Sequence, residues 1–323
     1  MTLLYMLEQI RNPFLDILMQ GVTWFGELYI FLVIALVVFW CIDKRTGFAL
    51  IFMGIVGVTI NQWLKMAFRI PRPWVLDPGF TIVETARKAA DGYSFPSGHT
   101  QLATTTYGGL LFWKKHRIPV TVILACILLA VPFSRMYLGV HTPWDTGTSF
   151  CIGLLLVALT VCGFRDFKRE KEQYAPLSLP AAEKQNAGIT VCMTAAIVLA
   201  AAEVIWLAVH TFPADLDLAN YASAMKNGCE MAGCAVGVLV IWILDVKKLH
   251  FETKAVWWAQ ILKCIGGIAV VLLVKLIPTS GLNAQIGLPI ASAVKYCLMV
   301  IVAGGIWPLT FPWFAKLGRK ELE

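Results

Sequence analysis

Long, nearly uncharged hydrophobic runs recur along this chain, and they constrain its fold more than any other feature. Examples are Gly47–Leu64, Ile118–Phe133 and Ile189–His210. An α-helix rises about 1.5 Å per residue, so runs of this length can cross about 30 Å of hydrocarbon. Because lipid offers no hydrogen bonds to the backbone, each such segment must satisfy its own polar groups. The runs therefore predict an all-α fold, a polytopic membrane helical bundle of about nine transmembrane helices.

The composition supports this interpretation. Hydrophobic residues make up 58% of the chain, charged residues 15%, and the mean hydropathy is +0.71. These values exclude an ordinary soluble domain. A net charge of +7 would suggest nucleic acid as a partner of a soluble protein. Here the basic residues stand mostly in short loops beside apolar segments, which is how membrane proteins are oriented, so we expect no nucleic acid partner.

The pattern of apolar runs gives an explicit topology. An amphipathic helix over Leu3–Val22, with Glu8, Arg11 and Asp16 among apolar residues, is expected to lie at the membrane interface. It lacks the pattern of a cleaved signal peptide. The expected spans are Trp24–Ile42, Gly47–Leu64, Ser97–Trp113, Ile118–Phe133, Thr142–Phe164, Ile189–His210, Ala222–Leu244, Ala255–Ile277 and Leu288–Trp307.

The loops predict the orientation of these spans. Every second connection is basic, and we assign these connections to the cytoplasmic side: residues 43–45, 114–117, 165–171 and 246–248, and the C-terminal tail. Residues 69–96 and 134–141 then share the opposite, extracytoplasmic face although they are distant in sequence.

Three cations and a helix start are expected on that face. Lys65, Arg72 and Arg135 come from separate segments, and an arginine fork matches phosphate oxygens while lysine adds a compact charge. Ser97 and Gly98 stand where a helix begins, and a helix N-terminus offers free amide donors to an anion. Together these residues predict a phosphate-binding site.

Two histidines and a carboxylate accompany the cations. Asp145 can hold one nitrogen of His141 and leave the other free to attack phosphorus, and His99 can protonate the leaving alkoxide as a general acid. The simpler interpretation of Thr142-Pro143-Trp144-Asp145 is a helix start, with threonine at the cap and an acid three residues on. The nine cysteines show no metal-ligand spacing and are interpreted as small apolar residues, so we expect no metal and no cofactor.

These motifs resemble the phosphatidic acid phosphatase type 2 superfamily. Its signature K-x6-RP, PSGH and SR-x5-H-x3-D is matched at every position: Lys65, Arg72, Pro73, Pro96, Ser97, Gly98, His99, Ser134, Arg135, His141 and Asp145. The resemblance implies a metal-independent phosphatase with a phosphohistidine intermediate on His141. It covers the first half of the chain, so we expect a catalytic membrane domain over residues 1–164, a cytoplasmic linker over 165–187 and a four-helix transmembrane extension over 188–323. The additional spans make the topology look like that of glucose-6-phosphatase and sphingosine-phosphate phosphatases.

The expected function is hydrolysis of a lipid phosphate in a bacterial inner or plasma membrane. Candidate substrates are phosphatidate, phosphatidylglycerophosphate, a polyprenyl pyrophosphate or a sphingoid phosphate. A lipid phosphotransferase could use the same phosphohistidine, and a lipid transporter or binding protein could carry a silent site. Vanadium haloperoxidases share the motifs but are soluble, which disfavours them.

Charged residues in the C-terminal spans also need an explanation, because charges inside membranes are costly. Lys226 and Glu230 are one helical turn apart and could form a simple ion pair. The set as a whole is interpreted as one wall of a headgroup cavity or as an interaction surface: Glu203, Lys226, Glu230, Lys275 and Lys295.

Overall fold

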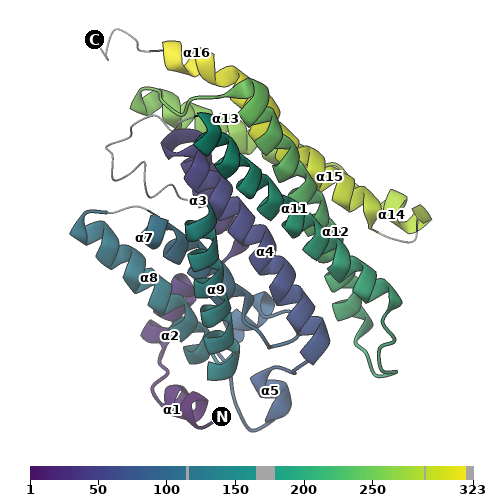
Figure 1. Ribbon diagram of the computed structural model, residues 1–323. Coiled ribbons are helices and arrows are strands. Elements are labelled where there is room, and N and C mark those ends of the chain that lie inside the picture. The colour runs from purple at the N-terminus through teal and green to yellow at the C-terminus, as the bar shows by residue number, and fades with distance from the viewer. Residues whose placement is uncertain (114–115, 165–178, 287–288, 318–323) are drawn as a thin grey trace. The chain divides into compact units, whose positions relative to one another are not determined.

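The computed structural model describes residues 1–113, 116–164, 179–286 and 289–317, which are helical or connect helices and contain no strand. The predicted all-α fold is therefore confirmed for this part of the chain (Figure 1). The chain divides into two compact units, each assembled from separated stretches of sequence. Unit 1 comprises residues 1–32, 57–159 and 212–224, and unit 2 comprises residues 33–56, 160–211 and 225–323.

The described residues contain seven helices that are long and apolar enough to cross a membrane: Lys44–Leu76, Ile118–Tyr137, Pro143–Phe164, Gln185–Val209, Leu218–Leu249, Trp257–Lys275 and Ile290–Lys316. An eighth is possible if Pro13–Trp24 and Leu28–Ile42, which meet at an angle of 47°, are counted as one span. The predicted membrane bundle is thus confirmed, with seven or eight spans in the described residues where about nine were expected.

The segment expected to span over Ser97–Trp113 accounts for part of the difference. Its helical stretch is continuous but only 16 residues long, and it comprises α6 (Gly98–Ala103), the π-helical turn η3 (Thr104–Gly108) and α7 (Gly109–Trp113). The hydroxyl groups of Thr104 and Thr106 donate to the carbonyls of Thr100 and Leu102, at 2.7 and 2.6 Å. Such bonds compete with the regular helical ladder and accompany its change of pitch here.

The N-terminal segment, predicted as one interfacial helix, forms two helices. Helix α1 covers Thr2–Gln9 and helix α2 covers Pro13–Trp24. The break has a local cause, because Asn12 Oδ1 accepts the backbone N–H of Leu15 at 3.0 Å and Pro13 opens α2. The side chains of Leu3 and Met6 on α1 are exposed, as expected for a helix at the membrane interface.

Unit 1 is organised around α8 (Ile118–Tyr137), which contacts α1, α2, α6, η3 and α7. The remaining elements with residues in this unit are the first half of α3 (Leu28–Val37), the C-terminal part of α4 (Lys44–Phe68), α5 (Pro73–Leu76), η2 (Glu84–Ala89), most of α9 (Pro143–Phe164) and the start of α12 (Leu218–Leu244). Gly153 lets α9 approach η3 closely, since a Cβ atom there would lie 2.7 Å from the Thr104 side chain. A buried cluster that includes Tyr137, Leu138 and Val140 supports the loop after α8.

Unit 2 contains the remaining helices. Its elements are the second half of α3 (Leu28–Val37), η1 (Val38–Ile42), the start of α4, the end of α9, α11 (Leu179–Val209), most of α12 (Leu218–Leu244), η4 (Asp245–Leu249), α13 (Trp257–Lys275), α14 (Ser280–Ile286), α15 (Ile290–Ile301), η5 (Val302–Ile306), η6 (Trp307–Thr310) and α16 (Phe311–Lys316). Edge-to-face rings fill its core: Phe39 packs on Phe48 at 4.9 Å and on Phe251 at 5.3 Å between centroids.

Several predicted segments fall partly outside the described residues. These are Lys114 and Lys115 of one basic loop, residues 165–178 of the predicted linker, Leu288 at the start of the last expected span, and the tail over 318–323. Helix α11 begins at Leu179, so residues 179–187, which were expected to belong to the linker, are helical. The domain boundaries and the orientation in the membrane stay predictions.

Candidate active site

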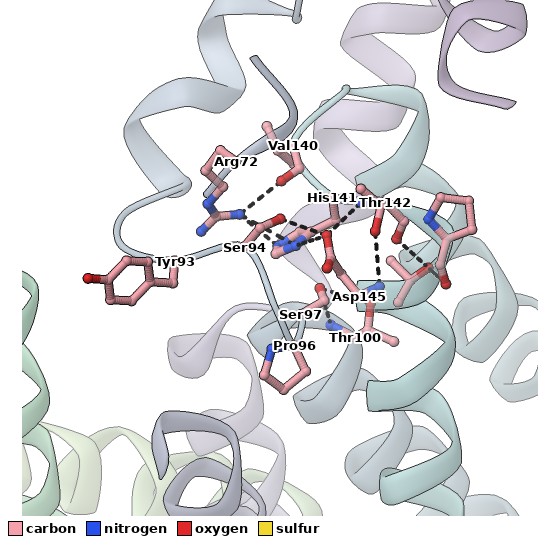
Figure 2. Close-up of polar contacts among 12 residues, drawn as sticks. Arg72, Tyr93, Ser94, Pro96, Ser97, Thr100, Val140, His141, Thr142 and Asp145 are labelled. Atoms are coloured by element: carbon pink, nitrogen blue, oxygen red, sulfur yellow. Dashed lines mark hydrogen bonds and ion pairs between the residues drawn. The ribbon is translucent and has the colours of Figure 1, made fainter. Parts of the chain in front are cut away.

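The three motif segments meet inside unit 1. They are the end of α4 with the stretch that leads to α5, the turn that leads into α6, and the end of α8 with the following loop and the start of α9. Figure 2 shows Arg72 from the first segment, Ser94 from the second, and His141 with Asp145 from the third, with their polar groups pointing toward one another. Segments that are far apart in the sequence therefore form one polar cluster.

A tight turn carries His141. Helix α8 ends at Tyr137, and Gly139 has a φ of +80°, which favours glycine over residues with a side chain. Helix α9 then begins at Pro143. Its first turn is closed by Thr142, whose Oγ1 accepts the N–H of Asp145 at 3.2 Å and whose own N–H donates to Asp145 Oδ2 at 2.6 Å. The helix start expected from this sequence is therefore present.

The same carboxylate faces the histidine. Asp145 Oδ2 is 3.6 Å from His141 Nδ1, and each side chain is only 2% exposed. Ser94 Oγ donates to this oxygen at 2.6 Å. Asp145 therefore serves both as a helix cap and as a partner of His141.

Arg72 is fixed by three backbone carbonyls. It donates to Asp91 O at 2.7 Å, to Gly92 O at 3.0 Å and to Val140 O at 2.9 Å. Its Nη1 also lies 2.9 Å from His141 Nε2. A guanidinium group can only donate, so this contact makes Nε2 the acceptor and leaves the imidazole proton on Nδ1, toward Asp145.

The electrostatic environment keeps His141 neutral. Burial lowers the pKa of His141 well below its usual range, and the positive charges of Arg72, Arg135 and Lys65 lower it further. His99 interacts electrostatically with the same three cations. The two histidines and the three cations thus share one positively charged site.

Two side chains of this cluster have unused donors or acceptors. Arg135 is fully buried, and its Nη1 donates to Thr23 Oγ1 at 2.9 Å. Among the described residues its Nε and Nη2 have no partner, and neither has the buried Nε2 of His99. Lys65 differs, because its Nζ donates to Tyr93 O at 2.8 Å. Unpaired groups on a buried cation are what an anionic ligand can satisfy.

Ser97 and Gly98 lie at the expected helix start. Ser97 Oγ accepts the N–H of Thr100 at 3.5 Å and thereby caps α6, which begins at Gly98. The backbone N–H of Ser97 donates to Asp145 O at 3.1 Å, which ties this turn to α9. The binding of phosphate by Ser97 and Gly98 stays a prediction.

Two residues that motif spacing did not single out also contact the cluster. Ser94 precedes the PSGH motif, and its donation to Asp145 cannot be inferred from spacing alone. Thr23 lies 112 residues before Arg135, at the end of α2. A small polar residue near the end of a mostly apolar helix is a weak sequence signal, because α2 also contains Asp16 and Gln20.

The charged residues that the sequence singles out in the C-terminal spans lie in unit 2: Glu203, Lys226, Glu230, Lys275 and Lys295. Lys226 Nζ is 4.0 Å from Glu230 Oε1, so the simple ion pair is present. Lys295 donates to Ile277 O at 3.2 Å. Glu203 is fully buried, and neither of its carboxylate oxygens has a hydrogen-bond partner in the described part of the chain. Their role as a cavity wall or interaction surface stays a prediction.

Comparison with known proteins agrees with the motif geometry. The family model described as "PAP2 superfamily" matches residues 46–169, the stretch that holds Lys65, Arg72, His99, His141 and Asp145. The phosphatidylglycerophosphatase B of Bacillus subtilis is 32% identical over 169 residues, which cover 48% of this chain and 77% of that protein. The chain belongs to the PAP2 superfamily.

Other matches fit this membership. A second model, described as "PAP2 superfamily phosphatase, transmembrane extension", matches residues 229–320. The undecaprenyl-diphosphatase BcrC of Bacillus subtilis is 32% identical over 115 residues, covering 36% of this chain and 53% of that protein. A crystal structure of Aquifex aeolicus LpxE aligns with a TM-score of 0.44 and 23% identity, over 50% of this chain and 93% of that one. The two family models and the Bacillus subtilis phosphatidylglycerophosphatase B confirm the expected resemblance to the PAP2 superfamily.

Proposed function

We propose that this PAP2 superfamily member is an integral membrane phosphatase that hydrolyses a lipid phosphate or pyrophosphate through a phosphohistidine on His141. The observation that carries the proposal is the arrangement around this residue. Its Nδ1 faces Asp145, its Nε2 faces Arg72, and the buried Arg135 nearby has donors without partners in the described residues. This arrangement combines an oriented nucleophile with groups that stabilise negative charge.

The first step forms the covalent intermediate. A phosphate oxygen replaces Nε2 as the partner of Arg72 Nη1, and the freed lone pair of Nε2 attacks phosphorus. The bond from phosphorus to the lipid oxygen breaks, and His99, which the negative charge of the bound phosphate holds in its protonated form, gives that oxygen its proton. Asp145 stabilises the positive charge that develops on the imidazole. Lys65, Arg72 and Arg135 balance the charge on the phosphoryl oxygens.

The second step releases phosphate. His99, now neutral, takes a proton from water, and the resulting hydroxide oxygen attacks phosphorus. The bond between phosphorus and Nε2 breaks, which restores neutral His141 and frees inorganic phosphate. The three cations neutralise the phosphoryl charge and His141 supplies the nucleophile, so the proposed reaction needs no divalent metal ion.

The proposed substrate is a phosphorylated lipid. The Bacillus subtilis relatives are named for phosphatidylglycerophosphate and undecaprenyl diphosphate, both lipids with a terminal phosphate. A site at the end of spanning helices allows the acyl or prenyl chain to remain in the bilayer while the headgroup reaches His141. Phosphatidate, phosphatidylglycerophosphate, polyprenyl pyrophosphate and sphingoid phosphates form the panel to be tested.

The test is phosphate release by the purified full-length protein in detergent across this panel. The wild-type protein is expected to release phosphate from at least one lipid, with undiminished turnover in EDTA, and His141→Ala is expected to release none. Thermal unfolding of the variant checks that it is folded. A folded His141→Ala protein with wild-type turnover contradicts the phosphohistidine, and loss of turnover in EDTA contradicts the metal-free reaction. Transfer of phosphate to an added alcohol, without release, identifies a phosphotransferase instead.

The proposed site faces the extracytoplasmic side of a bacterial plasma membrane, because the basic loops predict the opposite side as cytoplasmic. Trp144 stands beside His141 and is 81% exposed, so it offers a place for a label. Trp144→Cys is expected to react with a membrane-impermeant maleimide in intact spheroplasts, above the background of the wild-type cysteines. Reaction only after the membrane is opened contradicts this orientation.

A further inference from the structure

Two thiol groups in unit 2 lie in direct contact. The Sγ atoms of Cys41 in η1 and Cys264 in α13 are 3.2 Å apart, although the residues are separated by 223 positions in the sequence. Both are free cysteines and both are partly buried. The residues of the proposed active site belong to unit 1, so this contact stands independently of the proposed phosphatase.

The surrounding side chains hold the two helices in this register. One turn before Cys264, Gln260 Nε2 donates to Cys41 O at 3.4 Å. About one turn after it, Gly267 allows close approach, because a Cβ atom there would lie 2.6 Å from the ring of Trp40. Trp40 is fully buried and donates to Ala303 O at 2.9 Å. The contact between the sulfur atoms is therefore flanked by fixed contacts on both sides.

A buried cation accompanies the pair. Lys263 is fully buried, its Nζ donates to Thr253 O at 2.9 Å, and it interacts electrostatically with both thiol groups. A nearby ammonium group favours the thiolate, which is the reactive form of cysteine. Thr253 also lines a hollow that includes Ile42, the neighbour of Cys41, and the charged residues Asp43, Lys44, Glu252 and Lys254. The acceptor of Lys263 and the neighbour of Cys41 therefore line the same hollow of unit 2.

We propose that Cys41 and Cys264 form a reversible dithiol–disulfide site that hydrogen peroxide oxidises. The thiolate of one cysteine attacks peroxide, gains an oxygen as a sulfenic acid and releases hydroxide. The second thiolate then attacks the sulfenic sulfur, the S–O bond breaks, and the new S–S bond forms as a second hydroxide leaves. The two protons lost by the thiols neutralise both hydroxides, so the products are one disulfide and water. A dithiol reductant reverses the reaction by exchange.

Peptide mapping of the purified full-length protein in detergent tests this proposal. The reduced protein is treated with hydrogen peroxide, the remaining thiols are blocked with N-ethylmaleimide, and the digest is analysed by mass spectrometry without reductant. A peptide that links Cys41 to Cys264 is expected. It should disappear after treatment with dithiothreitol and be absent from Cys41→Ser and Cys264→Ser.

Cys126→Ser is the matched control, because Cys126 is an exposed cysteine of α8 in unit 1 and its loss should leave the cross-link unchanged. Recovery of Cys41 and Cys264 as separate N-ethylmaleimide or sulfinic acid products, at every peroxide concentration, overturns the proposal. A predominant link from either residue to another cysteine also overturns it. Because the wild-type map alone decides between these outcomes, a serine variant that fails to fold does not affect the test.

Discussion

Replacing Thr23 with valine tests whether helix α2 positions Arg135 in the proposed site. Thr23 is fully buried, and its Oγ1 is the one acceptor recorded for Arg135 in the described residues. Valine keeps the shape of threonine but removes this acceptor. The Nη1 of Arg135 then has no partner, while its Nε and Nη2 already have none.

The size of the effect follows from the cost of an unsatisfied buried donor. That cost is about 1–3 kcal/mol, and the guanidinium group can recover it by turning toward another acceptor. To bind phosphate in the productive orientation, Arg135 must then give up this alternative acceptor, which costs the same free energy. At about 1.4 kcal/mol for each factor of ten, Thr23→Val is expected to lower kcat/KM by about 5- to 150-fold.

The assay is phosphate release across a range of substrate concentrations, with inhibition by vanadate as a second measure of anion binding. Thr23→Ser keeps the hydroxyl group and is expected to retain kcat/KM and vanadate affinity close to the wild-type values. Thermal unfolding of all three proteins separates a folding defect from a binding defect. A folded Thr23→Val protein with wild-type kcat/KM refutes the reasoning, and so does a serine variant as impaired as the valine variant.

Three other predictions concern the loop between α8 and α9. Because burial and neighbouring cations lower the pKa of His141, this proposed nucleophile stays neutral as the pH falls below about 6.5. The acid limb of kcat/KM, corrected for the titration of the substrate, is therefore expected below that pH, and an acid limb above it contradicts a neutral nucleophile. Asp145→Asn is expected to lower kcat by about 100- to 10,000-fold because the amide cannot stabilise the imidazolium; wild-type phosphate release speaks against the role. Gly139→Ala places a Cβ atom 2.7 Å from Arg11 Nη2 at a φ of +80°. It is expected to reduce the free energy of unfolding by about 1–3 kcal/mol, and an unchanged unfolding temperature would show that the turn tolerates a side chain.

The membrane fold and the motif residues could be predicted because each has a local signal in the sequence. Apolar runs of spanning length indicate helices whatever their neighbours are. The motif around His141 also specifies its own turn, since Thr142 and Asp145 close the start of α9 with side chains three residues apart. Both interpretations of Asp145, as a helix cap and as a partner of His141, describe contacts that coexist.

Contacts made by packing between distant segments could not be predicted in the same way. Thr23 and Ser94 reach the cluster only because α2 and the turn before α6 fold against α8 and α9. The span count differed for a related reason. Hydropathy does not detect that the helical stretch from Gly98 to Trp113 is short and changes pitch at its threonines, nor that α2 and α3 meet at an angle.

The several contacts of Asp145 Oδ2 affect which residues are kept as the sequence evolves. Oδ2 accepts from Ser94 and from the backbone of Thr142, in addition to facing His141. Selection for a stable start of α9 alone would therefore preserve this aspartate in a descendant that no longer hydrolysed anything. The presence of this aspartate in a relative is therefore weak evidence of activity. The imidazole of His141 does not stabilise the start of α9 in this way, so its retention is the more informative marker.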